Sequence, residues 1–488
     1  VRLELIAEQT AWLTDNGVDV TNDDIKFEWD VEPESTIQAI FSVDGFLTGD
    51  DEEAGVDDYV GLIMDSSPFY AEAGGQEADL GVISIEDENG EVAEFQVTDV
   101  QSYGGFSLHT GKVKKGTFKV GSKVKSKVDY DRRREVAPNH TMTHVLNAAL
   151  REVLGDGVEQ RGSLCNDEKL RFDFSHKKAM SLKQLRRTED FVREKINNEE
   201  VVSSKVMPLE DAKAIDGVRA VFGEVYPDPV RVVSVGDDTS VEFCGGTHIG
   251  NTAEAEAFAI VEETAVAKGI RRITAVTKGL ASQAIQEGTK FDAIVTSVEQ
   301  EANEGKDLTQ LDKKAGSLRK DLDDGYMPAP LKAELRARIE AIQKKGIAAK
   351  KAALAGRVDR VLNVVSEQIK SAMEEGVKMI VLNVDIAADS KASQKVMKAA
   401  QKLAPDVAFM GISEEEPGSG GKVMCFALVP DKLVEEGFKA DEWVRSTLAV
   451  CGGRGGGKPG SAQGQAKECV DVEAVLAEGN AFAEKIMS

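Results

Sequence analysis

Two short motifs, far apart in the 488-residue sequence, carry side chains that bind metal ions. In H-T-M-T-H (residues 140–144) the two imidazoles are four residues apart, so on a helix they lie on one face. In C-G-G-T-H (residues 244–248) a thiolate is followed by a third imidazole, and the glycines between them allow a tight turn around an ion. Histidine and cysteine are preferred ligands of Zn²⁺, and four of them fill a tetrahedron. The sequence therefore predicts one zinc site, formed by His140, His144, Cys244 and His248.

Two other chemistries fit these motifs less well. A zinc protease of the H-E-x-x-H type needs a glutamate as its general base, and Thr141 stands at that position. A papain-like cysteine nucleophile is conceivable, because histidines lie near Cys244 in the sequence. The C-x-x-x-H and H-x-x-x-H spacings suit a shared ion better. Zinc remains the favoured interpretation.

A glycine-rich segment near the end of the chain is the other candidate site. The stretch from Gly452 to Lys458 formally fits G-x-x-x-x-G-K, but Pro459 stands where a nucleotide-binding loop needs Ser or Thr for Mg²⁺. A loop of this composition presents backbone N–H groups and positive charge to phosphates. We therefore predict a phosphate-binding loop of Arg454, Lys458, Gly453, Gly455, Gly456 and Gly457.

Composition limits the possible partners. The net charge of −25 argues against a nonspecific nucleic-acid binder, so any contact with RNA must be local. No stretch of about 18 consecutive apolar residues is present, so we expect no transmembrane helix and no membrane partner. Five scattered cysteines indicate a reducing compartment, so we expect a cytoplasmic protein, with an organelle as the alternative.

The helices and strands expected along the sequence, which must position these residues, indicate a multidomain α+β protein. Residues 1–30 read as a linker or helical remnant, and residues 31–130 as a small β-barrel of alternating strands. Residues 131–280 mix helices and strands in an α+β domain, with Pro138 in the first turn of the helix that carries His140.

The rest of the chain reads as a helical segment and a third domain. Residues 281–375 predict an antiparallel helical hairpin: leucine-rich 3-4 spacing from Leu308 to Leu322 is interrupted by the Pro-containing turn at 325–330 and then resumes. A pair of helices packed on a globular body is an equal alternative. Residues 376–488 predict a C-terminal α/β domain with crossover connections.

Several motifs in order resemble the editing part of alanyl-tRNA synthetases and their free-standing relatives. They are F-Y-A-E-A-G-G-Q (69–76), H-T-M-T-H, then G-S-L…L-R-F-D-F-S-H, and C-G-G-T-H. The resemblance implies zinc-dependent editing: hydrolysis of serine or glycine wrongly attached to tRNA-Ala. It assigns the four histidine and cysteine residues to zinc and places Thr143, Gln160, Gly245, Gly246 and Thr247 in the pocket. Without it, Thr143 would be expected to bond back along its helix and Gln160 to be a surface residue.

The resemblance also gives a role to the last domain and leaves alternatives open. The glycine-rich segment is similar to a loop that contacts tRNA in that family, and the alternative basic surfaces are Arg132–Arg134 and Arg271–Arg272. No class II activation motif precedes the barrel, so we expect editing without aminoacylation from this chain. The alternatives are a free-standing trans-editing deacylase and a noncatalytic tRNA-binding module with structural zinc. The hairpin and the C-terminal region could support a homodimer.

Overall fold

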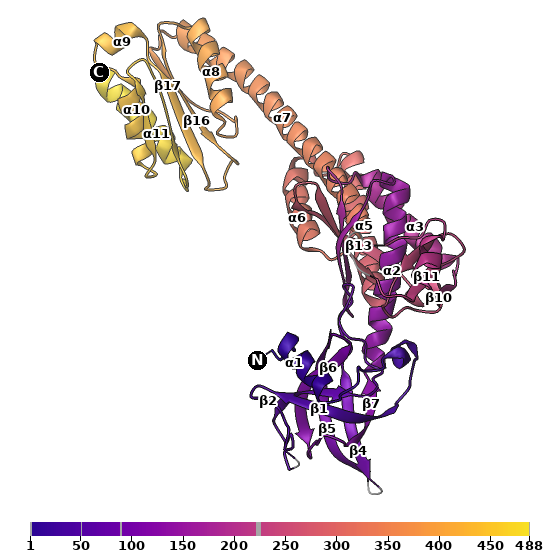
Figure 1. Ribbon diagram of the computed structural model, residues 1–488. Coiled ribbons are helices and arrows are strands. Elements are labelled where there is room, and N and C mark those ends of the chain that lie inside the picture. Colours follow the sequence, from indigo (N-terminus) through magenta and orange to yellow (C-terminus); the bar gives the residue numbers. More distant parts are fainter. Residues whose placement is uncertain (1, 50, 88–89, 221–225, 488) are drawn as a thin grey trace. The chain divides into compact units, whose positions relative to one another are not determined.

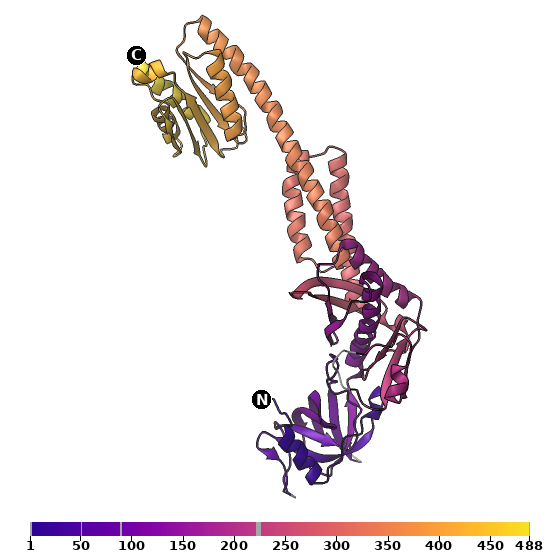
Figure 2. The same ribbon diagram turned by 45° about the horizontal axis from the view of Figure 1, so that its top comes forward.

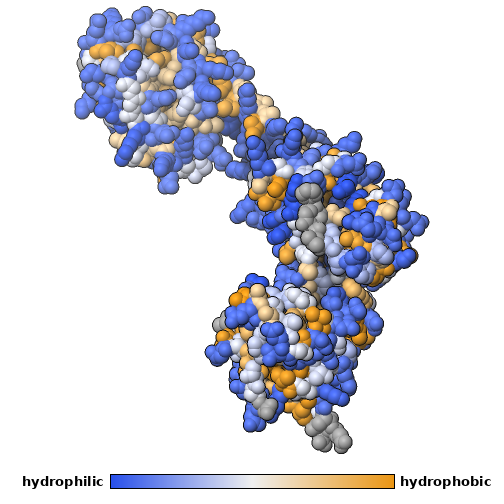
Figure 3. All heavy atoms as spheres, viewed as in Figure 1, coloured by the Kyte–Doolittle hydropathy of each residue, from blue (hydrophilic) through white to orange (hydrophobic). Residues whose placement is uncertain are grey.

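The computed structural model describes residues 2–49, 51–87, 90–220 and 226–487 (Figure 1). The chain divides into two compact units, Val1–Ser297 with Leu318–Ile339, and Val298–Ser317 with Glu340–Ser488. Hydrophilic side chains cover most of the visible face of each unit, as Figure 3 shows. Within the described residues, no helix combines the length and the apolar character needed to cross a membrane. The mixed α+β class expected from the sequence is confirmed.

A closed six-stranded barrel forms the first part of unit 1. Its strands pair antiparallel in the order β1-β3-β6-β5-β4-β7, and β7 pairs back with β1. In β7, alternation points Val124, Ser126 and Val128 inward and the lysines between them outward, as a half-buried strand requires. The six barrel strands are β1 Glu34–Ser42, β3 Tyr59–Met64, β4 Gly81–Asp87, β5 Gly90–Tyr103, β6 Phe106–Lys115 and β7 Lys123–Val128. The short strand β2 (Gly45–Phe46) pairs with β1 outside the closed ring.

The N-terminal residues pack on this barrel. Leu3, Leu5 and Leu13 are buried in one cluster with barrel residues such as Phe41 and Leu108. Two short elements belong to this segment, α1 (Ala7–Asp15) and the 3-10 helix η1 (Asp24–Phe27). The segment expected as a linker or helical remnant thus contributes to a hydrophobic core.

The second part of unit 1 places two helices, α2 and α3, against a four-stranded antiparallel sheet of order β13-β14-β9-β8. The α3 helix begins at a capping box of Ser181 and Gln184 and buries Leu185, Val192 and Ile196 on one face. A separate sheet has the order β10-β11-β12. The elements are α2 Tyr130–Leu154, β8 Gln160–Cys165, β9 Leu170–Ser175, α3 Leu182–Asn197, β10 Val202–Met207, α4 Leu209–Lys213, β11 Val230–Val235, β12 Ser240–Phe243, η2 Thr252–Ala255, β13 Phe258–Ala267 and β14 Ile270–Thr277.

The helix that carries His140 begins earlier than the sequence predicted. Asp129 caps it by accepting a hydrogen bond from the Arg132 N–H, so Pro138 lies in its interior and the expected position in the first turn is wrong. A proline lacks the N–H that would bond the carbonyl four residues back. That carbonyl belongs to Arg134 and instead accepts a hydrogen bond from Lys278 Nζ at 3.3 Å. A donor from outside the helix therefore makes the interior proline tolerable.

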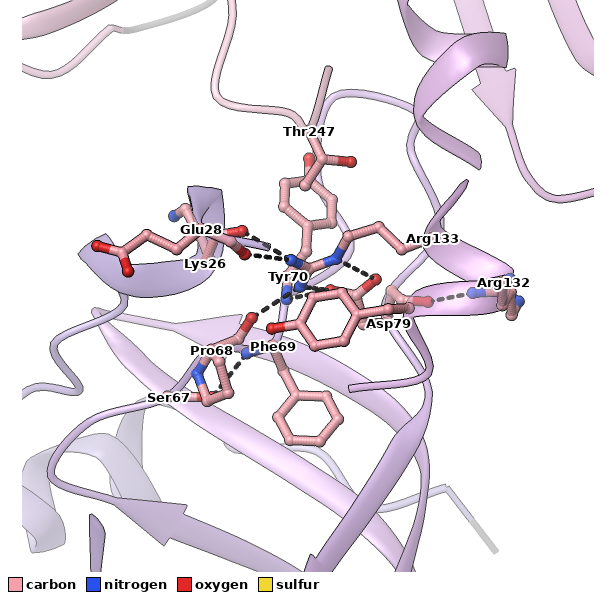
Figure 4. A network of polar contacts seen from close by, with 12 residues as sticks. Lys26, Glu28, Ser67, Pro68, Phe69, Tyr70, Asp79, Arg132, Arg133 and Thr247 are labelled. Atoms are coloured by element: carbon pink, nitrogen blue, oxygen red, sulfur yellow. Dashed lines mark hydrogen bonds and ion pairs between the residues drawn. The ribbon is translucent and has the colours of Figure 1, made fainter. Parts of the chain in front are cut away.

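A buried arginine in the first turns of α2 ties the barrel to the helix (Figure 4). Arg133 is 1% exposed and forms an ion pair with Asp79, which lies in the loop before β4. Its guanidinium also donates to the carbonyls of Lys26 (3.0 Å), Glu28 (3.3 Å) and Pro68 (2.7 Å). One side chain thus joins the N-terminal segment, the barrel and α2.

Three helices, rather than the expected hairpin of two, occupy residues 278–374, and Figure 2 shows them side by side. They are α5 (Lys278–Asn303), α6 (Leu311–Asp324, preceded by η3 Leu308–Gln310) and α7 (Ala329–Glu374). The turn falls at 325–328, and α7 then runs antiparallel to α6, with Lys350 Nζ 2.9 Å from Asp312. The leucine spacing correctly predicted the buried faces of α6 and α7, but α5 was not distinguished from them.

The C-terminal part of unit 2 is a five-stranded sheet of order β15-β16-β17-β19-β18, in which only the β15–β16 pair is parallel. The end of α7 and α8 bury one face of this sheet, and α10 and α11 bury the other. The elements are β15 Met379–Asn383, α8 Ser390–Leu403, β16 Ala408–Glu414, β17 Val423–Leu428, α9 Asp431–Glu435, α10 Ala440–Ala449, β18 Arg454–Lys458, β19 Ser461–Ala466 and α11 Val472–Met487.

The glycine-rich segment is an edge strand, so its prediction as a loop is wrong. It forms a hairpin with β19, in which Arg454 lies opposite Gln465 and Lys458 opposite Ser461. A Cβ added to Gly455 would lie 2.5 Å from Val444 of α10. Glycine at this position therefore allows helix α10 to approach the strand closely, which is one reason for glycine inside a strand.

Candidate metal centre and pocket

The structure brings the four predicted zinc ligands together. Helix α2 carries His140 and His144 on one face, and the loop that follows β12 carries Cys244 and His248. One ligand atom from each of the four residues lies within 4.8 Å of all the others. Cys244 Sγ is 3.4 Å from His140 Nε2 and 3.3 Å from His248 Nε2. These distances leave a space between the atoms that a coordinated ion would fill.

The outer nitrogens of the imidazoles face polar groups, as in metal centres. Thr141 donates its hydroxyl proton to the Ala137 carbonyl (3.1 Å), so it can only accept from His248 Nδ1, which is 3.1 Å away. This bond leaves the His248 Nε2 lone pair facing the cluster. His144 Nδ1 is buried without a hydrogen-bond partner and lies 3.8 Å from a carboxylate oxygen of Glu242.

The charges of the site favour a cation. Burial alone would raise the pKa of the Cys244 thiol, but the imidazoles of His140, His248 and His144 together hold it well below its ordinary value. Burial also works against protonation of His144, yet Glu242 and the Cys244 thiolate raise its pKa to about 9. Burial lowers the pKa of His248 to about 3. With its raised pKa, the His144 ring is cationic near neutral pH while no ion is bound, and it would release its proton to bind a metal. The Cys244 thiolate and the Glu242 carboxylate supply negative charge next to three imidazoles, and this donor set fits a divalent ion such as Zn²⁺.

A cavity of about 730 Å³ opens beside this cluster. His140, His144 and Cys244 line it, together with the predicted pocket residues Thr143, Gln160, Gly245 and Gly246 and the barrel residues Tyr70, Gly74 and Gly75. Thr247 does not line the cavity; it is buried, and its hydroxyl accepts a hydrogen bond from Gln76 at 2.8 Å. The site therefore offers a ligand both metal-binding and polar groups.

The two polar pocket residues have defined partners. Thr143 bonds back along its helix to the Asn139 carbonyl (2.8 Å), and its hydroxyl also lies 3.2 Å from Cys165 Sγ. Its one proton is therefore directed away from the cavity, which leaves a lone pair for a donor on the ligand. Gln160 donates to Ser163 Oγ at 3.1 Å.

Sequence reasoning missed several residues that shape the site. Arg231 Nη1 donates to the carbonyls of Cys244 (3.0 Å) and Gly246 (2.8 Å), and its guanidinium lies over the Phe27 ring. Glu242 and Cys165 were not singled out either. Gln76 belongs to a motif that carried the resemblance, but no role followed from its position. Contacts made across distant segments leave no local pattern, so only the fold reveals them.

The basic residues proposed for tRNA fall into two groups. Arg454, Gly456 and Lys458 alternate along the β18 edge strand in exposed positions, while Gly455 lies toward α10, and Gly453 and Gly457 pack close to neighbouring atoms. The alternative arginines form ion pairs, Arg132 with Glu77, Arg133 with Asp79, Arg134 with Asp30, Arg271 with Glu263 and Arg272 with Asp173. Arg133 is buried and cannot contact RNA, so that part of the alternative surface is excluded.

Family models match three parts of the chain. They are tRNA synthetases class II (A) at residues 8–132, the threonyl and alanyl tRNA synthetase second additional domain at 230–274, and the DHHA1 domain at 376–487. A crystal structure of the C-Ala domain from Aquifex aeolicus alanyl-tRNA synthetase matches 22% of this chain and 88% of that chain, at 18% identity and a TM-score of 0.18. A score so low supports no statement about a shared fold.

Curated relatives match much longer stretches. The cytoplasmic alanine–tRNA ligase of Dictyostelium discoideum is 35% identical over 99% of this chain and 52% of its own length. The cytoplasmic alanine–tRNA ligase of Bombyx mori is 38% identical over 87% of this chain and 45% of its own length. The mitochondrial alanine–tRNA ligase of Saccharomyces cerevisiae is 45% identical over 60% of this chain and 30% of its own length. The chain thus spans about half the length of the first two relatives, or less. Because these alignments and the family models agree along the chain, it is an alanyl-tRNA synthetase-related protein.

Proposed function

We propose that the chain hydrolyses the ester that joins wrongly attached serine or glycine to tRNA-Ala, at a zinc site formed by His140, His144, Cys244 and His248. The observation that carries this proposal is that three members of the four-residue cluster, His140, His144 and Cys244, lie in the wall of a cavity that Thr143 and Gln160 also line. A purely structural zinc site has no need of a ligand-sized cavity beside it. The match to the additional domain shared by threonyl and alanyl synthetases supports the same assignment.

The chemistry explains the need for such a site. A synthetase site that activates alanine rejects glycine or serine by only about 1–3 kcal/mol, because these amino acids differ from alanine by one small group. Accurate charging therefore requires a second site that hydrolyses the wrong products. A bound Zn²⁺ would supply Lewis acidity at the ester. The Thr143 lone pair can accept from the ammonium or hydroxyl of the aminoacyl group, and Gln160, at the start of β8, can orient the substrate from another part of the cavity wall.

The test is deacylation of purified aminoacyl-tRNAs. The chain should release serine and glycine from tRNA-Ala and largely spare alanyl-tRNA-Ala, since the site must not destroy the correct product. The rate is measured with radiolabelled amino acid on the tRNA. No release above the rate without protein would favour a noncatalytic tRNA-binding module.

Binding of tRNA is proposed for the exposed face of β18. Replacing Arg454 and Lys458 together by alanine should weaken tRNA affinity and reduce the slope of log affinity against log salt by up to about two phosphate contacts. The measurement is filter binding or fluorescence anisotropy at several salt concentrations. Replacing Lys395 and Lys398 of α8, also exposed, gives a control with the same change of charge. An unchanged affinity and slope in the Arg454, Lys458 variant would exclude β18 as the binding surface.

A further inference from the structure

A glutamine of the barrel reaches the metal cluster. Gln76 lies in the loop between β3 and β4 and is fully buried, with 0% exposure. Its backbone is held against the end of β8: the Cys165 N–H donates to the Gly75 carbonyl at 2.7 Å, and the Glu77 N–H donates to the Cys165 carbonyl at 3.0 Å. The loop that carries Gln76 is therefore fixed to the domain that carries the histidines.

The hydrogen bonds of this side chain fix the orientation of its amide. Gln76 Oε1 accepts from the Thr247 backbone N–H at 2.9 Å, and a backbone N–H can only donate. Gln76 Nε2 donates to the Thr247 hydroxyl at 2.8 Å. The reversed amide would place two donors against each other, so the oxygen must face the Thr247 N–H.

The amide orientation in turn fixes the tautomer of His140. Its Nδ1 lies 2.7 Å from the same Gln76 Oε1, and an oxygen of this kind can only accept, so Nδ1 carries the proton. The lone pair of His140 is then on Nε2, the nitrogen that lies 3.4 Å from Cys244 Sγ. Gln76 thus holds His140 in the form that binds a metal ion.

The surrounding contacts leave no room for another arrangement. A Cβ added to Gly246 would lie 2.0 Å from His140 Cε1 and 2.8 Å from Gln76 Oε1. The C-G-G-T-H loop therefore packs tightly against the side chains of Gln76 and His140. His144 and His248 face Glu242 and Thr141, which belong to the same domain as the histidines, whereas the partner of His140 comes from the barrel.

We infer that Gln76 is the positioning residue that presents His140 to the metal ion, so that the barrel is an integral part of the metal site. This inference rests on the proposed zinc site. It adds a role for the barrel that does not depend on contact with tRNA. Loss of a hydrogen-bond partner behind a metal-binding histidine weakens metal affinity by about 10–100-fold.

The experiment compares zinc affinities, measured on the full chain by competition with a chromogenic chelator. Gln76→Met has a similar size but offers only a weakly accepting sulfur in place of the amide oxygen, and its zinc affinity should fall about 10–100-fold. Gln76→Glu keeps an acceptor for both N–H groups, and the Thr247 hydroxyl can turn to donate to it, so its affinity should stay near that of the unaltered chain. Gln76→Asn, polar but one methylene shorter, should behave like the Met variant and is informative if the Met variant does not fold.

The matched control is Gln96→Met, a barrel glutamine that donates to the Gly81 carbonyl at 2.9 Å. It should bind zinc as the unaltered chain does. The inference would be overturned by an unchanged zinc affinity in Gln76→Met, or by a loss in Gln76→Glu or Gln96→Met as large as that in Gln76→Met. Failure of the unaltered chain to bind zinc in the same titration would instead overturn the proposed metal site.

Discussion

Replacing Cys244 with alanine should lower the rate of seryl-tRNA-Ala deacylation by about 100-fold or more. Cys244 is the only anionic ligand among the four, and its sulfur contacts both His140 and His248. Removing a residue that hydrogen-bonds to a metal ligand lowers metal affinity or activity by about 10–100-fold. Removing a direct ligand should therefore lower the activity at least as much. Affinity for tRNA should be nearly unchanged, because the proposed contact lies on β18. Single-turnover deacylation and equilibrium tRNA binding measure the two effects separately.

Cys451→Ala is the control for the loss of a thiol. Cys451 is half-buried like Cys244, but its thiol bonds the Leu448 carbonyl in the C-terminal domain. This variant should deacylate at the unaltered rate. Metal analysis completes the test: the double variant His140→Ala, Cys244→Ala should contain little zinc after purification. Full zinc content in that variant, or an unchanged rate in Cys244→Ala, would place the site elsewhere.

Local spacing was enough to predict the four side chains that the structure brings together, but not the groups that hold them in place. The histidines four apart on α2 and the C-x-x-x-H loop each carry their geometry in a few residues, so the sequence indicates them directly. Gln76, Arg231 and Glu242 act on those ligands from other segments, and hydrogen bonds between distant segments have no sequence period. Pocket residues Thr143 and Gln160 followed from the resemblance alone.

The errors in the fold have the same origin. Pro138 indicated the start of a helix because its missing N–H is harmless there, but Lys278, 140 positions away, satisfies the carbonyl that the proline leaves free. The glycine-rich segment indicated a loop, because glycine is uncommon in strands. Close packing of α10 on β18 reverses that preference, and only the tertiary structure shows it.

Replacing Arg133 with methionine should destabilise unit 1 by about 3–5 kcal/mol, the usual effect of removing one member of a buried ion pair. The substitution leaves the Asp79 carboxylate buried, with the Tyr70 N–H (2.8 Å) as a remaining donor. It also removes the donor to the carbonyls of Lys26, Glu28 and Pro68 (Figure 4). Denaturant unfolding should show a lower midpoint for the transition of unit 1 and an unchanged one for unit 2.

Arg134→Met is the matched control, since it removes the neighbouring arginine, whose partner Asp30 is exposed. An exposed pair contributes at most about 1 kcal/mol, so this variant should unfold nearly as the unaltered chain does. The double variant Arg133→Met, Asp79→Asn separates charge from packing. Its amide oxygen can still accept from the Tyr70 N–H but carries no charge, so it should be more stable than Arg133→Met alone. If the second substitution instead destabilised the protein further, the unpaired carboxylate would not be the cause, and the role of Arg133 would lie in its bonds to the three carbonyls.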